Sequence, residues 1–168
     1  MKRLTLVRHA KSSWKDPQLS DFDRPLNKRG KRDLPLMANR LQMFQIQPDL
    51  ILSSGARRAI TTAEQVALEQ DYPINKVIEV PELFHARVET LINLLQGQSD
   101  HYRHIMVVGH NPSLELASYY LTQENLANLP TCGVIHIALS ITCWEELSES
   151  CGSIERLDYP KLHQKTNA

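Results

Sequence analysis

Short apolar segments alternate with amphipathic helical segments along most of this chain, and the alternation limits the folds that it can adopt. The segment HIMVVG at 104–109 is almost continuously apolar, as expected for a strand that is buried on both faces of a sheet. Helices between such strands favour parallel pairing with helices on both faces. We therefore predict a three-layer α/β/α sandwich with a mostly parallel central sheet. The predicted strands are residues 3–8, 49–54, 76–80, 104–109, 134–140 and 153–159, and the predicted helices are residues 28–46, 56–70, 87–96 and 111–121.

Three segments depart from this regular pattern. Residues 9–26 form a long polar loop, which we expect to shape the rim of a binding site. Pro35 lies inside the first predicted helix, so this helix either begins near Asp33 or bends at the proline. The polar tail KLHQKTNA, residues 161–168, is expected to fray.

The composition argues against several classes of protein. The chain has 168 residues with 19 basic and 19 acidic side chains, so it has no overall charge that would attract nucleic acid or an acidic membrane. Its length suits one domain over residues 1–168. Cys132, Cys143 and Cys151 are odd in number and lack C-x-x-C spacing, which disfavours a disulfide framework or a zinc site. Without a membrane-length apolar run or a signal-peptide pattern, we expect a cytoplasmic protein with no nucleic-acid or membrane partner.

Cationic or cationisable side chains follow three of the predicted strands at the point where each strand ends. Arg8 and His9 close the first strand, and His110 follows the strand at 104–109. Arg58 comes four residues after the second strand, in the first turn of the next helix. Ligands of open parallel sheets bind beyond the carboxyl ends of the strands. Two guanidinium groups and two imidazoles at that edge therefore predict a site for a phosphate-like anion.

The segment GHNPSLE at 109–115 supports the same interpretation. Asn111 suits the N-cap of the following helix, and Pro112 suits its first helical position. His110 would then lie at a helix N-terminus, where unpaired N–H groups and the helix dipole favour an anion.

These motifs resemble those of the histidine phosphatase superfamily, in particular its short branch of SixA-type phosphohistidine phosphatases. The resemblance rests on LVRHAKSSW, SDFDRPLNKRG, ILSSGARRAITTAE and VVGHNPSLE, which occur in the family's order between about residues 3 and 122. Ala10 stands where the family's Arg-His-Gly signature has glycine, a replacement that a backbone with negative φ allows. Thr62 lies on the helix that follows the family's serine-then-arginine turn.

The resemblance implies the catalytic residues Arg8, His9, Arg58 and His110, with a phosphoryl intermediate on His9. A neutral imidazole is a competent nucleophile for phosphorus when a backbone carbonyl orients one ring nitrogen. The arginines would hold non-bridging oxygens, and a protonated His110 would stabilise the same charge. Because these groups supply the positive charge, we expect no metal and no other cofactor.

The proton donor is open between Glu82 and His85 in the segment VPELFHARVE. Larger members of the family carry a glutamate after the third strand, and here His85 takes approximately its place. Imidazole leaves phosphohistidine more readily than an alkoxide leaves an ester, so a weak donor favours phosphohistidine of a protein as the substrate. The short segment between Phe84 and Gly109 leaves no room for a large lid insertion.

Three residues of the 9–26 loop are further candidates for contact with the substrate: Lys11, Ser12 and Lys15. We expect a hydrolase of signal transduction, whose partner is a phosphohistidine-bearing protein or a phosphorylated small molecule. Two other functions fit the same site. One is a small-molecule phosphomonoesterase, and the other is a phospho-binding module without turnover.

Overall fold

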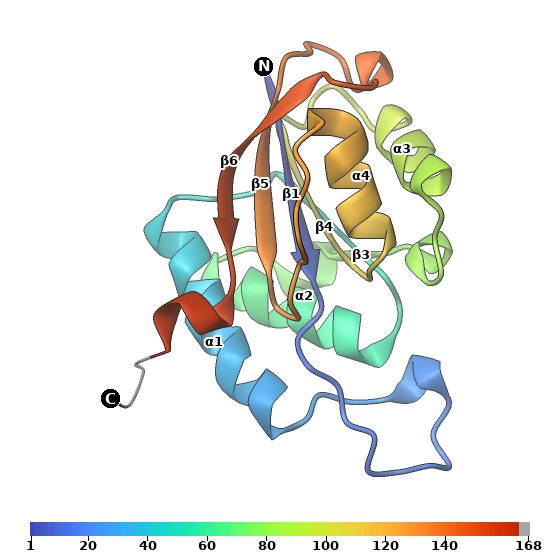
Figure 1. Cartoon of the computed structure of the whole chain (residues 1–168), viewed down its shortest axis with the longest axis vertical. Helices are drawn as coiled ribbons and strands as arrows, with labels where there is room; N and C mark the ends of the chain where they lie inside the picture. Colours follow the sequence, from blue (N-terminus) through green and yellow to red (C-terminus); the bar gives the residue numbers. More distant parts are fainter. Residues whose placement is uncertain (165–168) are drawn as a thin grey trace.

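The computed structural model describes residues 1–164, which form a six-stranded sheet and four α-helices (Figure 1). The strands are β1 (Lys2–Arg8), β2 (Leu50–Ser53), β3 (Ile78–Glu79), β4 (His104–Gly109), β5 (Val134–Leu139) and β6 (Gly152–Asp158), and the helices are α1 (Lys28–Met43), α2 (Arg57–Glu69), α3 (Val88–Gln96) and α4 (Ser113–Thr122). The order across the sheet is β3-β2-β4-β1-β5-β6. The first four strands in this order are parallel, whereas β5 runs antiparallel to β1 and β6 antiparallel to β5.

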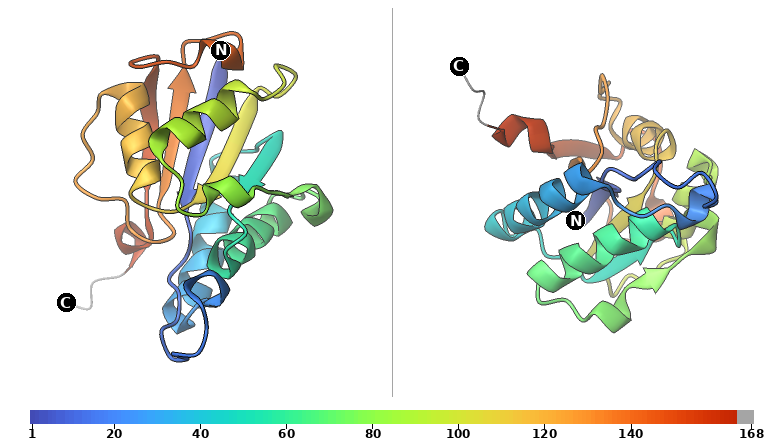
Figure 2. Two further views of the ribbon diagram at one scale, coloured as in Figure 1. Left: turned by 90° about the vertical axis from the view of Figure 1, so that its right-hand side faces the viewer. Right: turned by 90° about the horizontal axis from the view of Figure 1, so that it is seen from below.

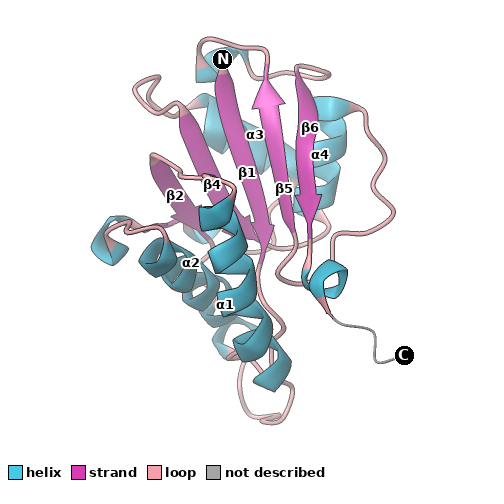
Figure 3. Ribbon diagram, turned by 90° about the vertical axis from the view of Figure 1, so that its left-hand side faces the viewer, coloured by secondary structure: helices cyan, strands magenta, loops and turns pink. Residues whose placement is uncertain are grey.

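The helices cover the sheet in pairs, which confirms the predicted α/β/α sandwich with a mostly parallel sheet. Helices α1 and α2 lie on one face, as Figure 3 shows with these helices in front of the strands. Helices α3 and α4 lie on the opposite face, toward the viewer in the left panel of Figure 2. Each pair encloses its own apolar core against the sheet.

Strand β4 shows why a buried parallel strand has a continuously apolar sequence. Its side chains alternate between the two faces, as the two-residue period of a strand requires. Ile105 and Val107 pack in the core under α3 and α4, whereas Met106 and Val108 pack in the core under α1 and α2. All four residues are 0% exposed, so both faces of the strand favour apolar side chains at these positions.

Helix α1 begins at Lys28 and continues through Pro35. The Asn27 side chain caps it by accepting a hydrogen bond from the Gly30 N–H at 2.8 Å, so the predicted start at Lys28 is confirmed and the alternative start near Asp33 is wrong. The proline is tolerated on the exposed side of the helix. The helix ends at Met43, earlier than predicted, because the chain turns at Gln45 with a φ of 55°.

Two other predicted elements are shifted or shortened. Helix α4 begins at Ser113, so Pro112 is its N-cap residue and Asn111 lies before the cap. The predicted capping roles of both residues are therefore wrong. Strand β3 has two exposed residues where five were predicted, because it is the edge of the sheet and pairs with β2 alone.

The segment after β6 begins with regular structure. Residues Pro160–His163 form a short 3-10 helix after β6, so the start of the tail that we expected to fray has regular structure. Residues 165–168 of that tail lie outside the described residues. Within residues 1–164, no helix has both the length and the apolar character needed to cross a bilayer.

The three cysteines are free thiols. Cys132 packs in the core under α1 and α2, and burial raises the pKa of its thiol to about 12. Such a thiol stays protonated at neutral pH and has little nucleophilic character.

Candidate active site

The carboxyl ends of β1, β2 and β4 gather the predicted anion-binding residues at one edge of the sheet, at the lower end of β1 in Figure 1. Arg8 of β1 pairs with Gly109 of β4, and the His9 N–H donates to the Gly109 carbonyl at 3.1 Å. This register places His110 beside His9, with 5.1 Å between the ring centroids. Arg58 is the second residue of α2, and its charge lowers the pKa of both histidines.

The ring of His9 is held in one orientation by the backbone. Its Nδ1 lies 2.8 Å from the Ala10 carbonyl oxygen. A carbonyl oxygen can only accept, so Nδ1 carries the proton and Nε2 keeps its lone pair. Burial, together with the charges of His110, Arg58 and Arg8, lowers the pKa of His9 to about 3. His9 is therefore a neutral imidazole at physiological pH, with an unprotonated Nε2.

Thr62 of α2 supports the chain immediately after His9. The Ala10 N–H donates to the Thr62 hydroxyl at 3.0 Å, and this hydroxyl donates to the Arg58 carbonyl at 2.7 Å. Ala10 is 0% exposed and is not among the residues with positive φ, so its methyl group causes no backbone strain. The alanine is thus compatible with the turn that presents His9.

Both arginines retain donors that no protein atom uses. Arg8 donates from Nη1 to the Leu129 carbonyl at 2.9 Å, and Arg58 donates from Nη1 and Nη2 to the carbonyl and carboxylate of Asp21 at 2.5 and 3.1 Å. Within residues 1–164, the Nε atoms of Arg8 and Arg58 are buried without a hydrogen-bond partner. Burial lowers the pKa of both guanidinium groups, but arginine stays charged in proteins. Two cations with unused donors beside His9, the buried Arg58 and the partly buried Arg8, are suited to an oxyanion.

The charge of His110 depends on whether the site holds an anion. Its Nε2 lies 2.8 Å from the Ser54 hydroxyl, and burial together with the charge of Arg58 lowers its pKa to about 4. His110 is therefore neutral at physiological pH when the site holds no anion, and the charge stabilisation that we predicted for it requires the protonated form. A phosphoryl group beside it would favour the protonated form, because an opposite charge raises the pKa of an imidazole.

Of the two candidate proton donors, His85 lies near these residues. Phe84 contacts His85 and His110: the centroid of its ring lies 3.9 Å from that of His85 and 5.6 Å from that of His110. The charge of His85 also lowers the pKa of His110. Glu82 is exposed in the preceding turn, and within residues 1–164 no hydrogen bond or ion pair joins it to any residue of the site.

The three candidate residues of the 9–26 loop, Lys11, Ser12 and Lys15, lie in different surroundings. Lys11 lines a pocket beside Arg8. The Ser12 hydroxyl is buried and accepts from Arg24 at 2.9 Å, so it stabilises the loop. Lys15 is exposed and lines a separate pocket against the start of α1, so the structure does not bring it to His9.

Sequence reasoning missed two supports of the arginines. The Asp21 carboxylate accepts a hydrogen bond from Arg58 and two from Arg24, at 3.0 and 2.8 Å. Burial raises the pKa of Asp21, but the hydrogen bonds and charges of these two arginines outweigh burial, so the pKa is lowered overall. The acidic run SDFD in a polar loop was a weak signal for this role. The Leu129 carbonyl holds Arg8, and no sequence signal predicts a contact made by the backbone.

Within residues 1–164, no group of three or more His, Cys, Asp and Glu side chains is arranged to hold a metal ion.

Comparison with known proteins places these features in a family context. Residues 4–84 match the model of the histidine phosphatase superfamily (branch 1). An uncharacterized chloroplastic protein of Arabidopsis thaliana is 33% identical over 153 residues, which cover 86% of this chain and 70% of the relative.

Solved structures share the fold across almost the whole chain. The proposed phosphohistidine phosphatase SixA of Agrobacterium tumefaciens is 28% identical with a TM-score of 0.81, covering 95% of this chain and 98% of its own. A protein histidine phosphatase SixA in complex with tungstate is 22% identical with a TM-score of 0.83, covering 96% and 99% of the two chains.

Proposed function

This chain belongs to the histidine phosphatase superfamily and is SixA-type, and from that premise we propose that it removes the phosphoryl group from a phosphohistidine of a protein. The phosphatase domain would span residues 1–168. The observation that carries the proposal is the hydrogen bond between His9 Nδ1 and the Ala10 carbonyl, which leaves the Nε2 lone pair free among cationic side chains.

In the first step, the Nε2 lone pair of His9 attacks phosphorus and forms a P–N bond. The P–N bond of the substrate breaks, and its electron pair leaves with the imidazole of the substrate. Arg8 and Arg58 hold the non-bridging oxygens, and their charges stabilise the transition state. His110, 5.1 Å from His9 between ring centroids, becomes protonated in the presence of the phosphoryl group and stabilises the same charge.

In the second step, water attacks the phosphoryl group on His9. The new P–O bond forms as the P–N bond breaks, and the electron pair returns to Nε2. Phosphate leaves as H2PO4⁻, which carries both protons of the water. His9 is again neutral and ready for another cycle, as its low pKa requires.

The leaving group supports a phosphohistidine substrate over a phosphate ester. An imidazole can carry a proton on its second ring nitrogen, so that it departs neutral without a donor from the enzyme. An alkoxide needs a proton from the enzyme. Within residues 1–164, Glu82 is exposed and makes no hydrogen bond or ion pair with the site, which favours a substrate whose leaving group needs no proton from the enzyme.

A small-molecule phosphomonoesterase is the second candidate function. It is favoured by His85, a candidate proton donor whose ring contacts Phe84 next to His110 and whose charge acts on His110. We infer cytoplasmic signal transduction as the setting of the first candidate, since its substrate would be a phosphorylated signalling protein.

Phosphate release from two substrates separates the candidate functions. A phosphohistidine peptide should be hydrolysed much faster than p-nitrophenyl phosphate. Comparable rates on both substrates would favour the phosphomonoesterase. Binding of the peptide without release of phosphate from either substrate would identify a phospho-binding module and refute the enzyme proposal. Activity should be unchanged after treatment with EDTA, since the arginines and histidines supply the positive charge; loss of activity that Mg²⁺ restores would contradict a metal-independent mechanism.

A further inference from the structure

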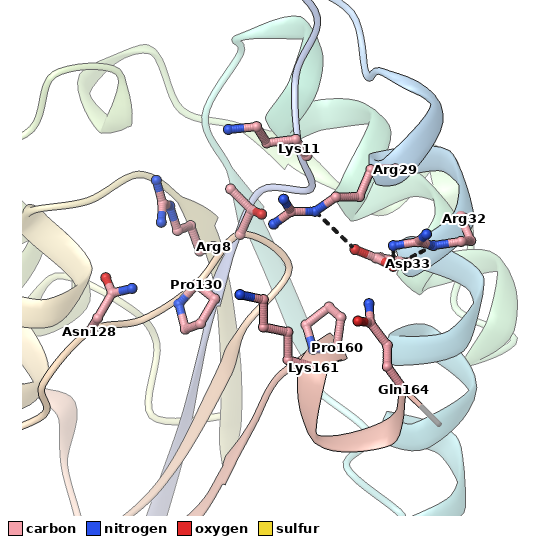
Figure 4. Close-up of a pocket in the computed structure, with 11 residues that line it drawn as sticks. Arg8, Lys11, Arg29, Arg32, Asp33, Asn128, Pro130, Pro160, Lys161 and Gln164 are labelled. Carbon is pink, nitrogen blue, oxygen red and sulfur yellow. Dashed lines mark hydrogen bonds and ion pairs between the residues drawn. The ribbon is translucent and has the colours of Figure 1, made fainter. Parts of the chain in front are cut away.

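A second cationic pocket of about 310 Å³ lies beside Arg8, on the side toward α1 and the C-terminal 3-10 helix (Figure 4). We propose that this pocket binds a second anionic group of the substrate, namely an acidic side chain that flanks the phosphohistidine of the protein. The inference extends the proposed function, on which it rests, by specifying an acidic surface around the phosphorylated residue.

The pocket has an excess of positive charge. Its lining includes five cationic side chains, Arg8, Lys11, Arg29, Arg32 and Lys161, and a single carboxylate, Asp33. That carboxylate is buried and already shared by two cations, with Arg29 at 3.7 Å and Arg32 at 3.1 Å. Within residues 1–164, no acidic side chain forms an ion pair with Lys11 or Lys161. These two lysines are available to a ligand.

Three separate elements contribute these cations. Lys11 comes from the loop after β1, Arg29 from the first turn of α1, and Lys161 from the 3-10 helix after β6. Figure 4 shows the nitrogen ends of the three side chains around the same space beside Arg8. Like charges repel each other, so their convergence is favourable when an anion lies between them.

The wall of the pocket is continuous with the active site. Asn128, Pro130 and Thr131 line the pocket, and Leu129 between them accepts the hydrogen bond from Arg8. The same segment continues to Cys132, whose N–H donates to the carbonyl of the nucleophile His9 at 3.0 Å. A substrate with its phosphoryl group on Arg8 can therefore place a neighbouring group in the pocket.

The shape of the pocket favours a protein side chain as the source of the anion. Arg29, Arg32, Asn128 and Lys161 are exposed residues on its rim, so the pocket opens to solvent. A glutamate from an approaching protein surface has the reach to enter it, whereas its volume is larger than a single carboxylate or phosphate needs. The second phosphate of a small molecule would meet the same cations, and the experiment distinguishes the two sources.

The experiment compares kcat/KM for two phosphohistidine peptides that differ in two flanking residues, glutamate in one and glutamine in the other. The enzymes are the wild type, Lys161→Gln, the double variant Lys11→Gln/Lys161→Gln, and the control Lys76→Gln. Lys76 is an exposed lysine near β3, at the opposite edge of the sheet from β6. A parallel arm compares a sugar bisphosphate with its monophosphate.

We expect the wild type and Lys76→Gln to prefer the glutamate peptide by about fivefold, because several partly exposed ion pairs contribute small, additive energies. The preference should fall in Lys161→Gln, disappear in the double variant, and weaken at high salt. Equal rates on the two peptides in the wild type, or a preference that persists in the double variant, would overturn the inference. A bisphosphate preference alone would assign the pocket to a small molecule and refute the acidic protein surface.

Failure of the proposed function has a different signature. If neither peptide is hydrolysed, phosphohistidine is not the substrate. Binding of the same two peptides to His9→Ala, measured by fluorescence anisotropy, then tests the pocket without turnover. Tighter binding of the glutamate peptide that depends on Lys161 would support the pocket, and equal binding would overturn it.

Discussion

Thr62→Val tests how the protein positions His9, the proposed nucleophile. The substitution keeps the shape of the side chain but removes the hydroxyl that accepts from the Ala10 N–H at 3.0 Å and donates to the Arg58 carbonyl at 2.7 Å. The Arg58 carbonyl loses little, because it also accepts within the α2 helical ladder. The Ala10 N–H loses its partner in a fully buried position, which costs about 1–3 kcal/mol.

We therefore expect the free energy of unfolding to fall by about 2 kcal/mol in urea titrations of Thr62→Val. The kcat for a phosphohistidine peptide should fall by about tenfold, because the Ala10 carbonyl that orients His9 loses its support. Thr62→Ser is the matched control: it keeps the hydroxyl and loses one methyl group, worth about 0.8 kcal/mol, so kcat should stay near the wild-type value. Equal stability and equal kcat in the valine and serine variants would refute this reasoning.

Three further predictions concern charge. Arg58→Lys should lower kcat/KM by about 100-fold, since an ammonium group cannot both bind Asp21 and present the planar, multiple N–H donors of a guanidinium to the phosphoryl group. A wild-type kcat/KM in this variant would show that the guanidinium geometry is not needed. Burial, together with the charge of His136, lowers the pKa of His104 to about 4, so below pH 6.5 the unfolded chain binds a proton that the folded chain does not. Stability should thus fall between about pH 6.5 and pH 4 by up to about 3 kcal/mol from this residue, and His104→Gln should show a shallower fall in urea titrations; identical pH profiles would contradict the assignment. Any hydrolysis of an alkyl phosphate should drop about 100-fold in His85→Ala and stay unchanged in Glu82→Gln, whereas the opposite pattern would make Glu82 the proton donor.

The sequence predicted the layers of the fold because strands buried on both faces have a distinctive composition. Segment 104–109 matches β4 at both ends, since its apolar run is bounded by polar residues. The edge strand β3 lacked this signal, because a strand with one neighbour and exposed side chains is not constrained to be apolar. The start of α4 was misplaced for a different reason: Asn111 has the chemistry of a cap but uses its amide to hold Glu115 and the Leu129 carbonyl.

The positions of the site residues could be predicted because they follow from strand ends in a parallel sheet. Arg8 and His110 come together through the pairing of β1 with β4, which the alternation of strands and helices already indicates. The charge of His110 could not be predicted, since it depends on burial and on the distance to Arg58. The hydrogen bonds from Arg58 to Asp21 depend on the path of an irregular loop, which no periodic pattern in the sequence specifies.

The central claim is that Nε2 of His9 carries the phosphoryl group during turnover. The enzyme should be mixed with a phosphohistidine peptide, quenched in base to preserve phosphohistidine, and analysed by mass spectrometry after proteolysis. We expect one added phosphoryl group on the peptide that contains His9, and its absence in His9→Asn together with loss of turnover. A phosphoryl group on His110 instead, or continued turnover by His9→Asn, would contradict this claim.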